Sequence, residues 1–407
     1  MKIIFSKKLK ELREKLNMEQ SEIAHQLRFS VTLYRELEEG KRYVPLASLK
    51  KISNCFFANP FYLLFGVVGI TSHSKLRLTA EDTFGAWFYK WVFSKSEQVN
   101  FGQISSYSSM SQSVLPVFAD IRLCDITWED VNAYLSTKKY LAAKTAKDHR
   151  TLIKQVFDFA GRCRVINYNP AVGAYVPKEC AKAIETATIS PKMQKMVFET
   201  SHEMQLAAVI MLLAGLRRGE LLALTFKDIH LDEEDTSSIT VKRVVELQND
   251  HPSLQERAKT ENGVREIMIE KNLYHFIKKY KKRYPLKKDD DYIISDENGL
   301  PLTGKKFRNK WKDYIANLNA KYGDFPLLPF EDIDKLPMRI MPFTSKCLRH
   351  TYATNLYIAN TDVVTAKDQL GHSKVSTTLD FYTHLDSVFK QSSINNYQNM
   401  MSKLFNE

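Results

Sequence analysis

The stretch that decides the fold is Leu370-Gly-His-Ser-Lys-Val-Ser-Thr-Thr-Leu-Asp-Phe-Tyr-Thr-His384, in which a histidine is followed by a tyrosine. Two arginines and a lysine stand in separate segments earlier in the chain. In chain order the set is Arg217, Lys259, Arg349, His372 and Tyr382. Cationic groups around a phenol can hold a phosphodiester and let the tyrosine attack it, with neither metal nor ATP. No cofactor and no metal are therefore expected.

Each residue type in this set has a chemical reason to be present. A phosphodiester under in-line attack becomes a pentavalent dianion, and arginine forks can bind its non-bridging oxygens in a bidentate grip. A tyrosine hydroxyl, whose ordinary pKa is about 10, becomes a useful nucleophile when nearby cations stabilise its phenolate. The leaving 5′ oxygen needs a proton, which a lysine can donate. The set therefore predicts phosphoryl transfer to a tyrosine.

Four stretches, taken together and in order, resemble the signature boxes of the tyrosine recombinases, the phage-integrase family. They are Ala214-Gly-Leu-Arg-Arg-Gly-Glu-Leu-Leu-Ala-Leu224, Ala258-Lys-Thr-Glu-Asn-Gly-Val-Arg-Glu-Ile-Met268, Leu348-Arg-His-Thr-Tyr-Ala-Thr354 and the stretch quoted first. The resemblance implies that Arg217 and Arg349 are the two catalytic arginines and that Lys259 is the β-hairpin lysine. It further implies that His372 is the third-box histidine and Tyr382 the nucleophile.

One position departs from the family pattern. The family usually has a histidine three residues before the second arginine, whereas this chain has Lys346 there, in Thr344-Ser-Lys-Cys-Leu-Arg349. Lysine occurs at this position in some members, and we interpret Lys346 as a donor to the phosphate. The identity of the general base stays open.

Single residues of the set also have ordinary explanations. Arg217 follows an apolar run, Leu206 to Leu216, and could cap the C-terminal end of a helix, where cations are favoured. Glu220, one helical turn after Arg217, is expected to hold hydrogen bonds around that arginine. Only the joint order and spacing of the set favours catalysis.

Composition narrows the class of protein. The chain has 407 residues, a formal charge of +12 and a pI near 9.2, which favour a polyanionic partner. Its five cysteines are an odd number without C-x-x-C spacing, which favours a reducing cytosol over a disulfide framework or structural zinc. The longest apolar runs fall short of the roughly 20 residues of a membrane span. We expect neither a membrane partner nor a secretion signal, and a cytoplasmic, nucleoid-associated location.

The N-terminal residues 1–66 have the apolar spacing of five short helices. The stretches Leu9 to Arg13, Glu19 to Ala24 and Arg35 to Arg42 resemble the helix-turn-helix of the Cro/repressor-like family. In that interpretation Ser30 caps the recognition helix. The expected DNA contacts of this module are Val31, Thr32 and Arg35 in the major groove and Gln20 at a phosphate. The alternative is a helical module that contacts proteins.

A linker over 67–79 leads to a second helical block over 80–177, which resembles the SAM-like core-binding domain of integrases. An aromatic face is expected on its first helix, and Thr127 is expected to cap a later one. Its candidate phosphate contacts are Lys138, Lys139, Lys144, Lys147, His149, Arg150 and Lys154. A solvated surface explains these lysines equally well.

A hinge over 178–187 precedes the expected catalytic domain, 188–395, and a tail helix over 396–407. Ser190 and Pro191 form a good helix start. Strands are expected over 238–246 and 265–269, with Lys259 on a hairpin between them. The predicted fold class is mainly α and multidomain: a helix-turn-helix bundle, a SAM-like helical domain and an α+β catalytic domain with a small antiparallel sheet.

The resemblance implies site-specific DNA recombination by the integrase of a mobile element, through a 3′-phosphotyrosine intermediate. Its implied partners are double-stranded DNA at attachment sites and a homotetramer on that DNA, with DNA-bending or excision factors as further candidates. Two alternatives remain. One is a DNA-binding transcriptional regulator with a relic catalytic domain, and the other is a type IB topoisomerase.

Overall fold

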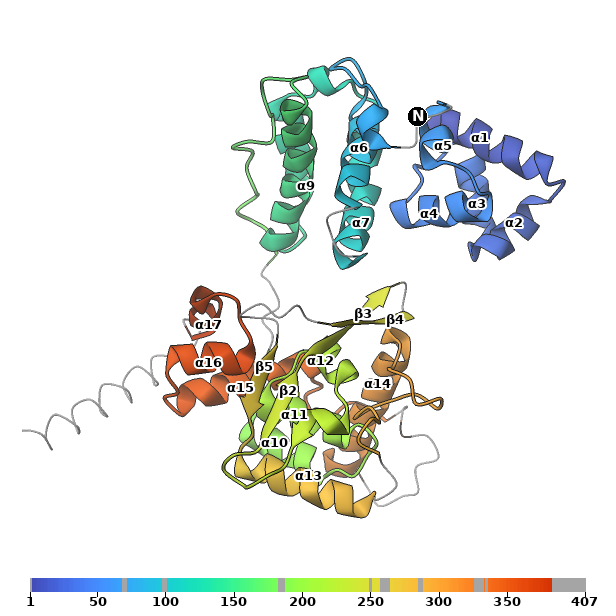
Figure 1. Ribbon diagram of the computed structural model, residues 1–407. Helices are drawn as coiled ribbons and strands as arrows, with labels where there is room; N and C mark the ends of the chain where they lie inside the picture. Colours follow the sequence, from blue (N-terminus) through green and yellow to red (C-terminus); the bar gives the residue numbers. More distant parts are fainter. Residues whose placement is uncertain are drawn as a thin grey trace, which may run out of the picture. The chain divides into compact units, whose positions relative to one another are not determined.

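The structure is a computed structural model. It describes residues 2–67, 72–96, 101–181, 187–248, 251–256, 264–284, 288–325, 333 and 336–382. The chain divides into two compact units, 1–184 and 185–407 (Figure 1). Each unit is described by itself. None of the helices in the described ranges is both long enough and apolar enough to cross a membrane.

The first unit begins with the five short helices that the apolar spacing predicts. They are α1 (Lys2–Lys15), α2 (Gln20–Leu27), α3 (Val31–Glu38), α4 (Leu46–Cys55) and α5 (Pro60–Phe65). Ser30 is the N-cap of α3, and its side chain accepts the backbone N–H of Leu33 at 3.1 Å. Such a cap contributes about 1 kcal/mol to helix stability. The prediction that Ser30 caps this helix is confirmed.

The same unit continues with a helical block. Its elements are η1 (His73–Lys75), α6 (Phe84–Ser96), α7 (Phe101–Phe118), η2 (Leu123–Asp125), α8 (Trp128–Ser136) and α9 (Ala143–Arg162). Thr127 caps α8 as predicted, in a reciprocal capping box with Asp130. The expected aromatic face of α6 is buried in a core that this block shares with α1–α5.

The second unit combines helices with two small antiparallel sheets (Figure 1). Its helices are α10 (Pro191–Glu199), α11 (Gln205–Ala214), α12 (Arg218–Ala223), η3 (Phe226–Asp228), α13 (Lys271–Arg283), α14 (Gly304–Tyr322), α15 (Ser345–Ile358), α16 (Val363–Leu370) and α17 (Val375–Tyr382). Its strands are β1 (Ile229–His230), β2 (Ser238–Val241), β3 (Arg243–Gln248), β4 (His251–Glu256) and β5 (Arg265–Met268). Ser190 caps α10 through the N–H of Met193, with Pro191 at the first helical position.

The expected strand over 238–246 is two strands that serve different sheets. β2 lies between β1 and β5, and its register pairs Ser238 with Met268 and Val241 with Arg265. β3 instead pairs with β4, which the sequence did not predict. Lys259 follows β4, and it lies outside the described residues, as does the expected hairpin turn around it.

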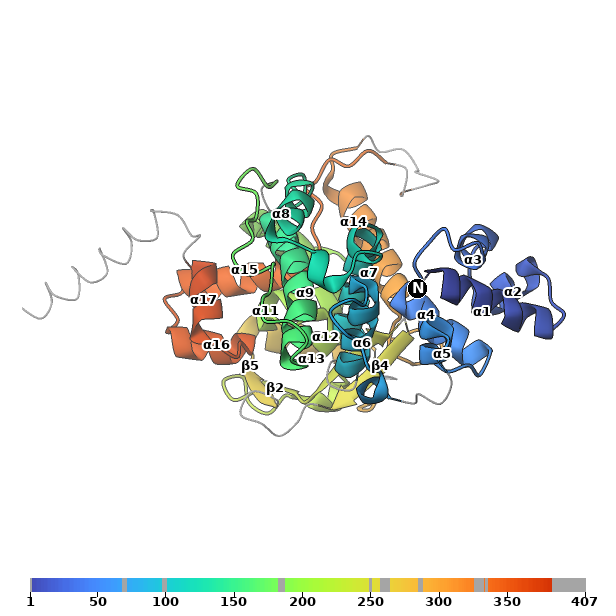
Figure 2. The same ribbon diagram turned by 90° about the horizontal axis from the view of Figure 1, so that it is seen from above.

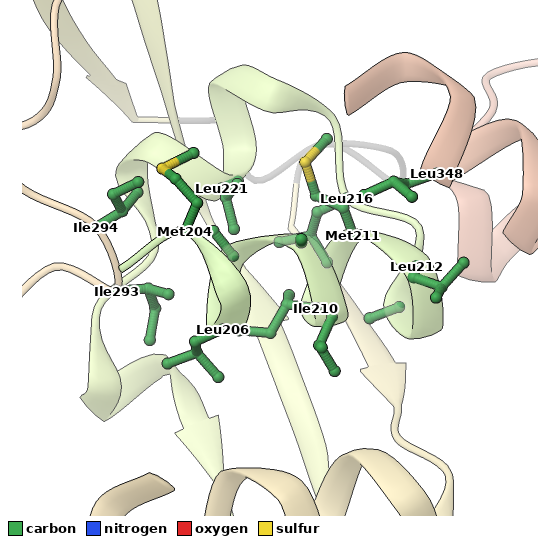
Figure 3. Packing of buried hydrophobic residues seen from close by; sticks show 14 of the residues in the cluster. Met204, Leu206, Ile210, Met211, Leu212, Leu216, Leu221, Ile293, Ile294 and Leu348 are labelled. Atoms are coloured by element: carbon green, nitrogen blue, oxygen red, sulfur yellow. The ribbon is translucent and has the colours of Figure 1, made fainter. Parts of the chain in front are cut away.

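Helix α11 is the centre of the second unit's core. Most of its residues are buried, and Figure 3 shows Leu206, Ile210 and Leu212 among side chains from neighbouring segments. An all-round apolar helix of this kind is stable only inside a protein. Its C-terminal end is therefore a firmly held point, and the turn that follows carries Arg217.

Candidate active site

Arg217 begins helix α12 and does not end the helix before it. α11 stops at Ala214, Gly215 adopts the left-handed conformation with φ of +62°, and Arg217 is the N-cap residue of α12. A Cβ atom at position 215 would lie 2.3 Å from the ring of Tyr352, so the turn requires glycine. The alternative that Arg217 caps a helix C-terminus is wrong.

The guanidinium of Arg217 is held from two sides. Its Nη1 donates to Oε1 of Glu220 at 2.9 Å, and its Nη2 donates to the carbonyl oxygen of Gly371 at 2.9 Å. The backbone N–H of Arg217 donates to Oε2 of Glu220, also at 2.9 Å. The side chain stays 40% exposed. The expected role of Glu220 around Arg217 is thus confirmed, and the fork is fixed while it remains open to a ligand.

Glu220 binds a second arginine that the sequence interpretation left without a role. Nη1 and Nη2 of Arg265, on β5, donate to the two carboxylate oxygens at 3.1 and 2.8 Å. Burial alone would raise the pKa of Glu220, but the bonds and charges of Arg265 and Arg217 outweigh burial and lower it to about 2. Glu220 is therefore ionised at neutral pH and fixes both arginines.

Arg349 lies on α15 and is almost completely buried, with 9% of its surface exposed. Its Nη1 donates to the carbonyl oxygen of Gly215, and its Nη2 donates to that of Leu370 at 2.6 Å. Burial and the charge of Arg217 lower the pKa of Arg349 to about 9, so the group stays cationic at neutral pH. A guanidinium has five N–H donors, and these two bonds leave others for a phosphate.

His372 stands directly after the turn that ends α16. Its Nδ1 is 2.9 Å from the hydroxyl of Thr378 on α17, and both side chains are buried. Burial, followed by the charges of Arg349 and Arg217, lowers the pKa of His372 to about 4. The imidazole is therefore neutral at pH 7, when it can donate from one ring nitrogen only. Thr378 is a second residue to which the sequence interpretation gave no role.

Gly371 allows this close arrangement of arginines. It has a φ of +62°, and a Cβ atom there would lie 2.7 Å from the guanidinium of Arg265. Its carbonyl oxygen accepts the bond from Arg217. The turns at 215–217 and 370–372 are thereby linked by Arg217 and Arg349, so the structure brings together Arg217, Arg349 and His372 as the sequence predicted.

Of the other three predicted catalytic residues, Lys346 is described in full, Tyr382 by its backbone only, and Lys259 not at all. Lys346 lies exposed in the first turn of α15. The burial of the neighbouring His350, followed by the charge of Lys346, lowers the pKa of His350 to about 4. The backbone of α17 reaches Tyr382, whose side chain lies outside the described part, as does Lys259.

The electrostatic balance of the site favours an anion. Among the described residues, Arg217 and Arg265 bind the carboxylate of Glu220, and Arg349 interacts electrostatically with the same group, so three cations face one anion there. Burial, and after it the repulsion from Arg217 and Arg265, lowers the pKa of Arg349. A phosphoryl group would neutralise this excess and accept hydrogen bonds from the two arginine forks.

The predicted DNA contacts in the first unit divide into exposed and engaged groups. Val31, Thr32 and Arg35 are exposed on α3, whereas Nε2 of Gln20 donates to Oε1 of Glu38 at 3.3 Å. Four predicted phosphate contacts on α9, at positions 144, 147, 150 and 154, are at least partly accessible. Lys147 is exposed, Lys144 pairs with Asp148, Lys154 pairs with Asp158, and Arg150 donates to the carbonyl oxygen of Ala174.

Two further candidates in that block belong to the interior. His149 is buried, with Nδ1 at 2.7 Å from the hydroxyl of Tyr134. Lys138 is also buried, with its Nζ 4.6 Å from the centre of the Tyr134 ring. The interpretation of these two as surface phosphate contacts is wrong, because packing around Tyr134 encloses both.

Comparison with known proteins identifies the second unit. The sequence profile described as the phage integrase family matches residues 185–388, half of the chain. The chain belongs to the phage integrase family. A helix-turn-helix profile matches residues 9–63 of this integrase-family chain.

Individual relatives agree with the family assignment. A tyrosine recombinase XerC-like protein of Caldanaerobacter subterraneus is 24% identical over 269 residues, which cover 60% of this chain and 63% of that protein. The ICEBs1 integrase of Bacillus subtilis is 26% identical over 262 residues, covering 60% of this chain and 62% of that protein. The chain thus spans about three fifths of the length of these curated relatives.

A solved structure supports the fold. The Tn1549 transposon integrase, in complex with transposon right end DNA, superposes with a TM-score of 0.60 and 20% identity. The match covers 77% of this chain and 99% of that one. The predicted fold class, mainly α with small antiparallel sheets in a phage-integrase architecture, is confirmed.

Proposed function

We propose that this integrase-family chain is a site-specific DNA recombinase, the integrase of a mobile element, and that it cleaves and rejoins DNA through Tyr382. One observation carries the proposal. Arg217, Arg349 and His372 converge on two linked turns from three separate segments, and the following helix α17 leads to Tyr382. The relatives support it, because they include the ICEBs1 integrase and a transposon integrase in complex with transposon end DNA.

In the proposed reaction the hydroxyl oxygen of Tyr382 attacks the scissile phosphorus as its proton departs. A new bond forms between that oxygen and phosphorus, and the bond from phosphorus to the 5′ oxygen breaks. Lys259 protonates the leaving oxygen. The products are a 3′-phosphotyrosine and a 5′ hydroxyl, and a second 5′ hydroxyl reverses the steps to rejoin DNA. The number of phosphoester bonds is unchanged, so the reaction consumes no ATP.

The binding groups have distinct parts in this scheme. Arg217 and Arg349 hold the non-bridging oxygens, and their fixed positions mean that little reorganisation is needed as charge develops. Neutral His372 donates one hydrogen bond, while Thr378 and Glu220 keep His372 and Arg217 in place. Lys346 adds a further cation at the edge of the site.

The proposed partners follow from the reaction. The substrate is double-stranded DNA at attachment sites, and exchange of strands between two duplexes requires a homotetramer, one protomer for each cleaved strand. DNA-bending or excision factors are further candidate partners. The reaction would take place where chromosomal DNA is, in the cytoplasm at the nucleoid.

A covalent adduct is the decisive measurement. We expect the protein, incubated with a nicked attachment-site duplex from its element's end, to form a denaturant-resistant protein–DNA species. Tyr382→Phe should abolish that species and keep DNA affinity, because only the nucleophilic oxygen is lost. Tyr352 is not a suitable substitute, since it is buried and burial raises its pKa to about 12. Tyr357→Phe is the matched control and should react like the wild type.

The rival proposal is a DNA-binding regulator whose catalytic domain is a relic. That proposal predicts specific DNA binding with no adduct in either the wild type or the variant. An adduct that persists in Tyr382→Phe would instead remove the assignment of the nucleophile.

A further inference from the structure

The N-terminal helices do not stand apart from the helical block that follows them. Tyr89, on α6, is fully buried, and its hydroxyl donates to the carbonyl oxygen of Val44 at 2.6 Å. The rings of Phe61 on α5 and Phe93 on α6 have centroids 4.6 Å apart. One continuous apolar core therefore joins the helix-turn-helix module to the block.

Polar contacts close the same interface at its edges. Nζ of Lys2 lies 3.6 Å from a carboxylate oxygen of Asp120, and Nη2 of Arg42 donates to Oε1 of Gln112 at 3.4 Å. Separation of the module would expose the Tyr89 and Phe93 rings and leave the Tyr89 hydroxyl to find a new partner. Burial of aromatic rings and a satisfied buried hydroxyl both favour the docked state.

This docking leaves the recognition helix uncovered. In both views α4 and α5 lie next to α6 and α7, while α2 and α3 lie farther from them (Figures 1 and 2). Val31 on α3 is 39% exposed, and Thr32 and Arg35 are exposed as well. The side chains of α3 that face the major groove in helix-turn-helix proteins thus remain exposed when the module is docked.

We propose that the helix-turn-helix module and the α6–α9 block bind double-stranded DNA as one rigid body. Helix α3 then reads base pairs at a fixed distance and a fixed helical phase from the duplex held by α9. The inference rests on the proposed function, since it takes this integrase to act on DNA.

A tethered module would behave differently. If residues 67–79 were a free linker, its ends would range over roughly 20 Å. That range corresponds to about six base-pair steps at about 3.4 Å each. A tethered module would therefore tolerate small changes in the spacing of its sub-site, whereas a docked module does not.

The test changes the DNA and leaves the protein intact. Hydroxyl-radical footprinting of the full chain on its element's end would first separate the base pairs protected by α3 from those of the core site. The double substitution Thr32→Ala with Arg35→Ala identifies the base pairs that α3 protects, because this variant should lose protection at those base pairs alone. Two or five base pairs are then inserted between the two segments. Five base pairs rotate the sub-site by about half a helical turn.

We expect either insertion to lower affinity roughly tenfold to a hundredfold, to the level of the double substitution on the unaltered duplex. Lys10→Ala, an exposed change on α1, should bind like the wild type on every duplex. Unchanged affinity after the insertions would overturn the rigid body, and unchanged binding by the double substitution would overturn DNA reading by α3. Neither outcome affects adduct formation on the core site, whose failure would count against the proposed function instead.

Discussion

Glu220→Gln should uncouple the arginines of the active site, because one buried carboxylate fixes two of them. The folded protein lowers the pKa of Glu220 from its ordinary value of 4.5 to about 2. At about 1.4 kcal/mol for each pKa unit, the charged form is favoured by about 3 kcal/mol in the folded state. Removal of one partner of a buried ion pair typically costs about 3–5 kcal/mol. The variant should therefore unfold with a free energy lower by that amount.

The pH dependence of this difference gives a sharper check. An unfolded chain protonates Glu220 near pH 4.5, whereas the folded protein keeps it ionised to about pH 2. Its contribution to stability is therefore complete above pH 4.5 and is lost as the pH falls toward 2. Glu220→Gln has no such contribution to lose. The stability gap between wild type and variant should consequently narrow over this window.

Urea unfolding at several pH values measures the gap, and hydrogen exchange of peptides from α11 to α12 assigns it to the second unit. Glu266→Gln on β5 is the matched control, since Glu266 is exposed and bonded to Ser238. That control should change stability by no more than about 0.5 kcal/mol. A gap below about 1 kcal/mol for Glu220→Gln, or one that does not depend on pH, would refute the reasoning, because Glu220 would then behave like a surface carboxylate.

Three further outcomes follow from the same contacts. Arg217→Ala should slow single-turnover adduct formation by on the order of a hundredfold or more, the scale for loss of one transition-state donor, and a wild-type rate would remove Arg217 from the phosphate site. Thr378→Val should slow cleavage by an amount equivalent to about 1–3 kcal/mol of transition-state stabilisation, because it removes the hydroxyl that binds a buried ring nitrogen of His372. Thr378→Ser should restore most of the lost cleavage rate, and equal rates for both variants would count against the bond. Lys346→Ala should lose about 1.5–3 kcal/mol of transition-state stabilisation, while Lys346→His should retain most activity. If the cleavage rate of the wild type rises with pH and that of the Lys346→Ala variant does not, Lys346 is instead the general base.

Local features of the fold could be predicted from the sequence. The caps at Ser30, Thr127 and Ser190 were correct because a cap depends on residues within one helical turn. The strands at β2 and β5 were also predicted correctly, from the β-branched residues in these two stretches. Strand β4 was missed because its exposed side chains lack the alternation that marks a half-buried strand.

Contacts between segments that lie far apart in the chain could not be predicted from the sequence pattern. Arg265 and Thr378 lie inside two of the family stretches, yet their partners Glu220 and His372 become visible only when strands and helices assemble. His149 was placed on the surface because a histidine among lysines on an amphipathic helix does not reveal the hydroxyl of Tyr134 opposite it. The docking of α5 on α6 was also not predicted, because a short stretch that contains serine and lysine between two helical blocks is typical of a linker.

The bonds of Arg349 to the backbone have a consequence for the evolution of such chains. This side chain ties the carbonyl oxygens of Gly215 and Leu370, so its loss would loosen two turns in addition to any chemistry. A descendant that has abandoned DNA cleavage is still under pressure to fold, and it would keep this arginine. In a relative that lacks the tyrosine, an intact arginine pair is therefore weak evidence of activity. Drift at the position of Tyr382, whose hydroxyl oxygen the proposed reaction itself requires, is the better sign of a decayed gene.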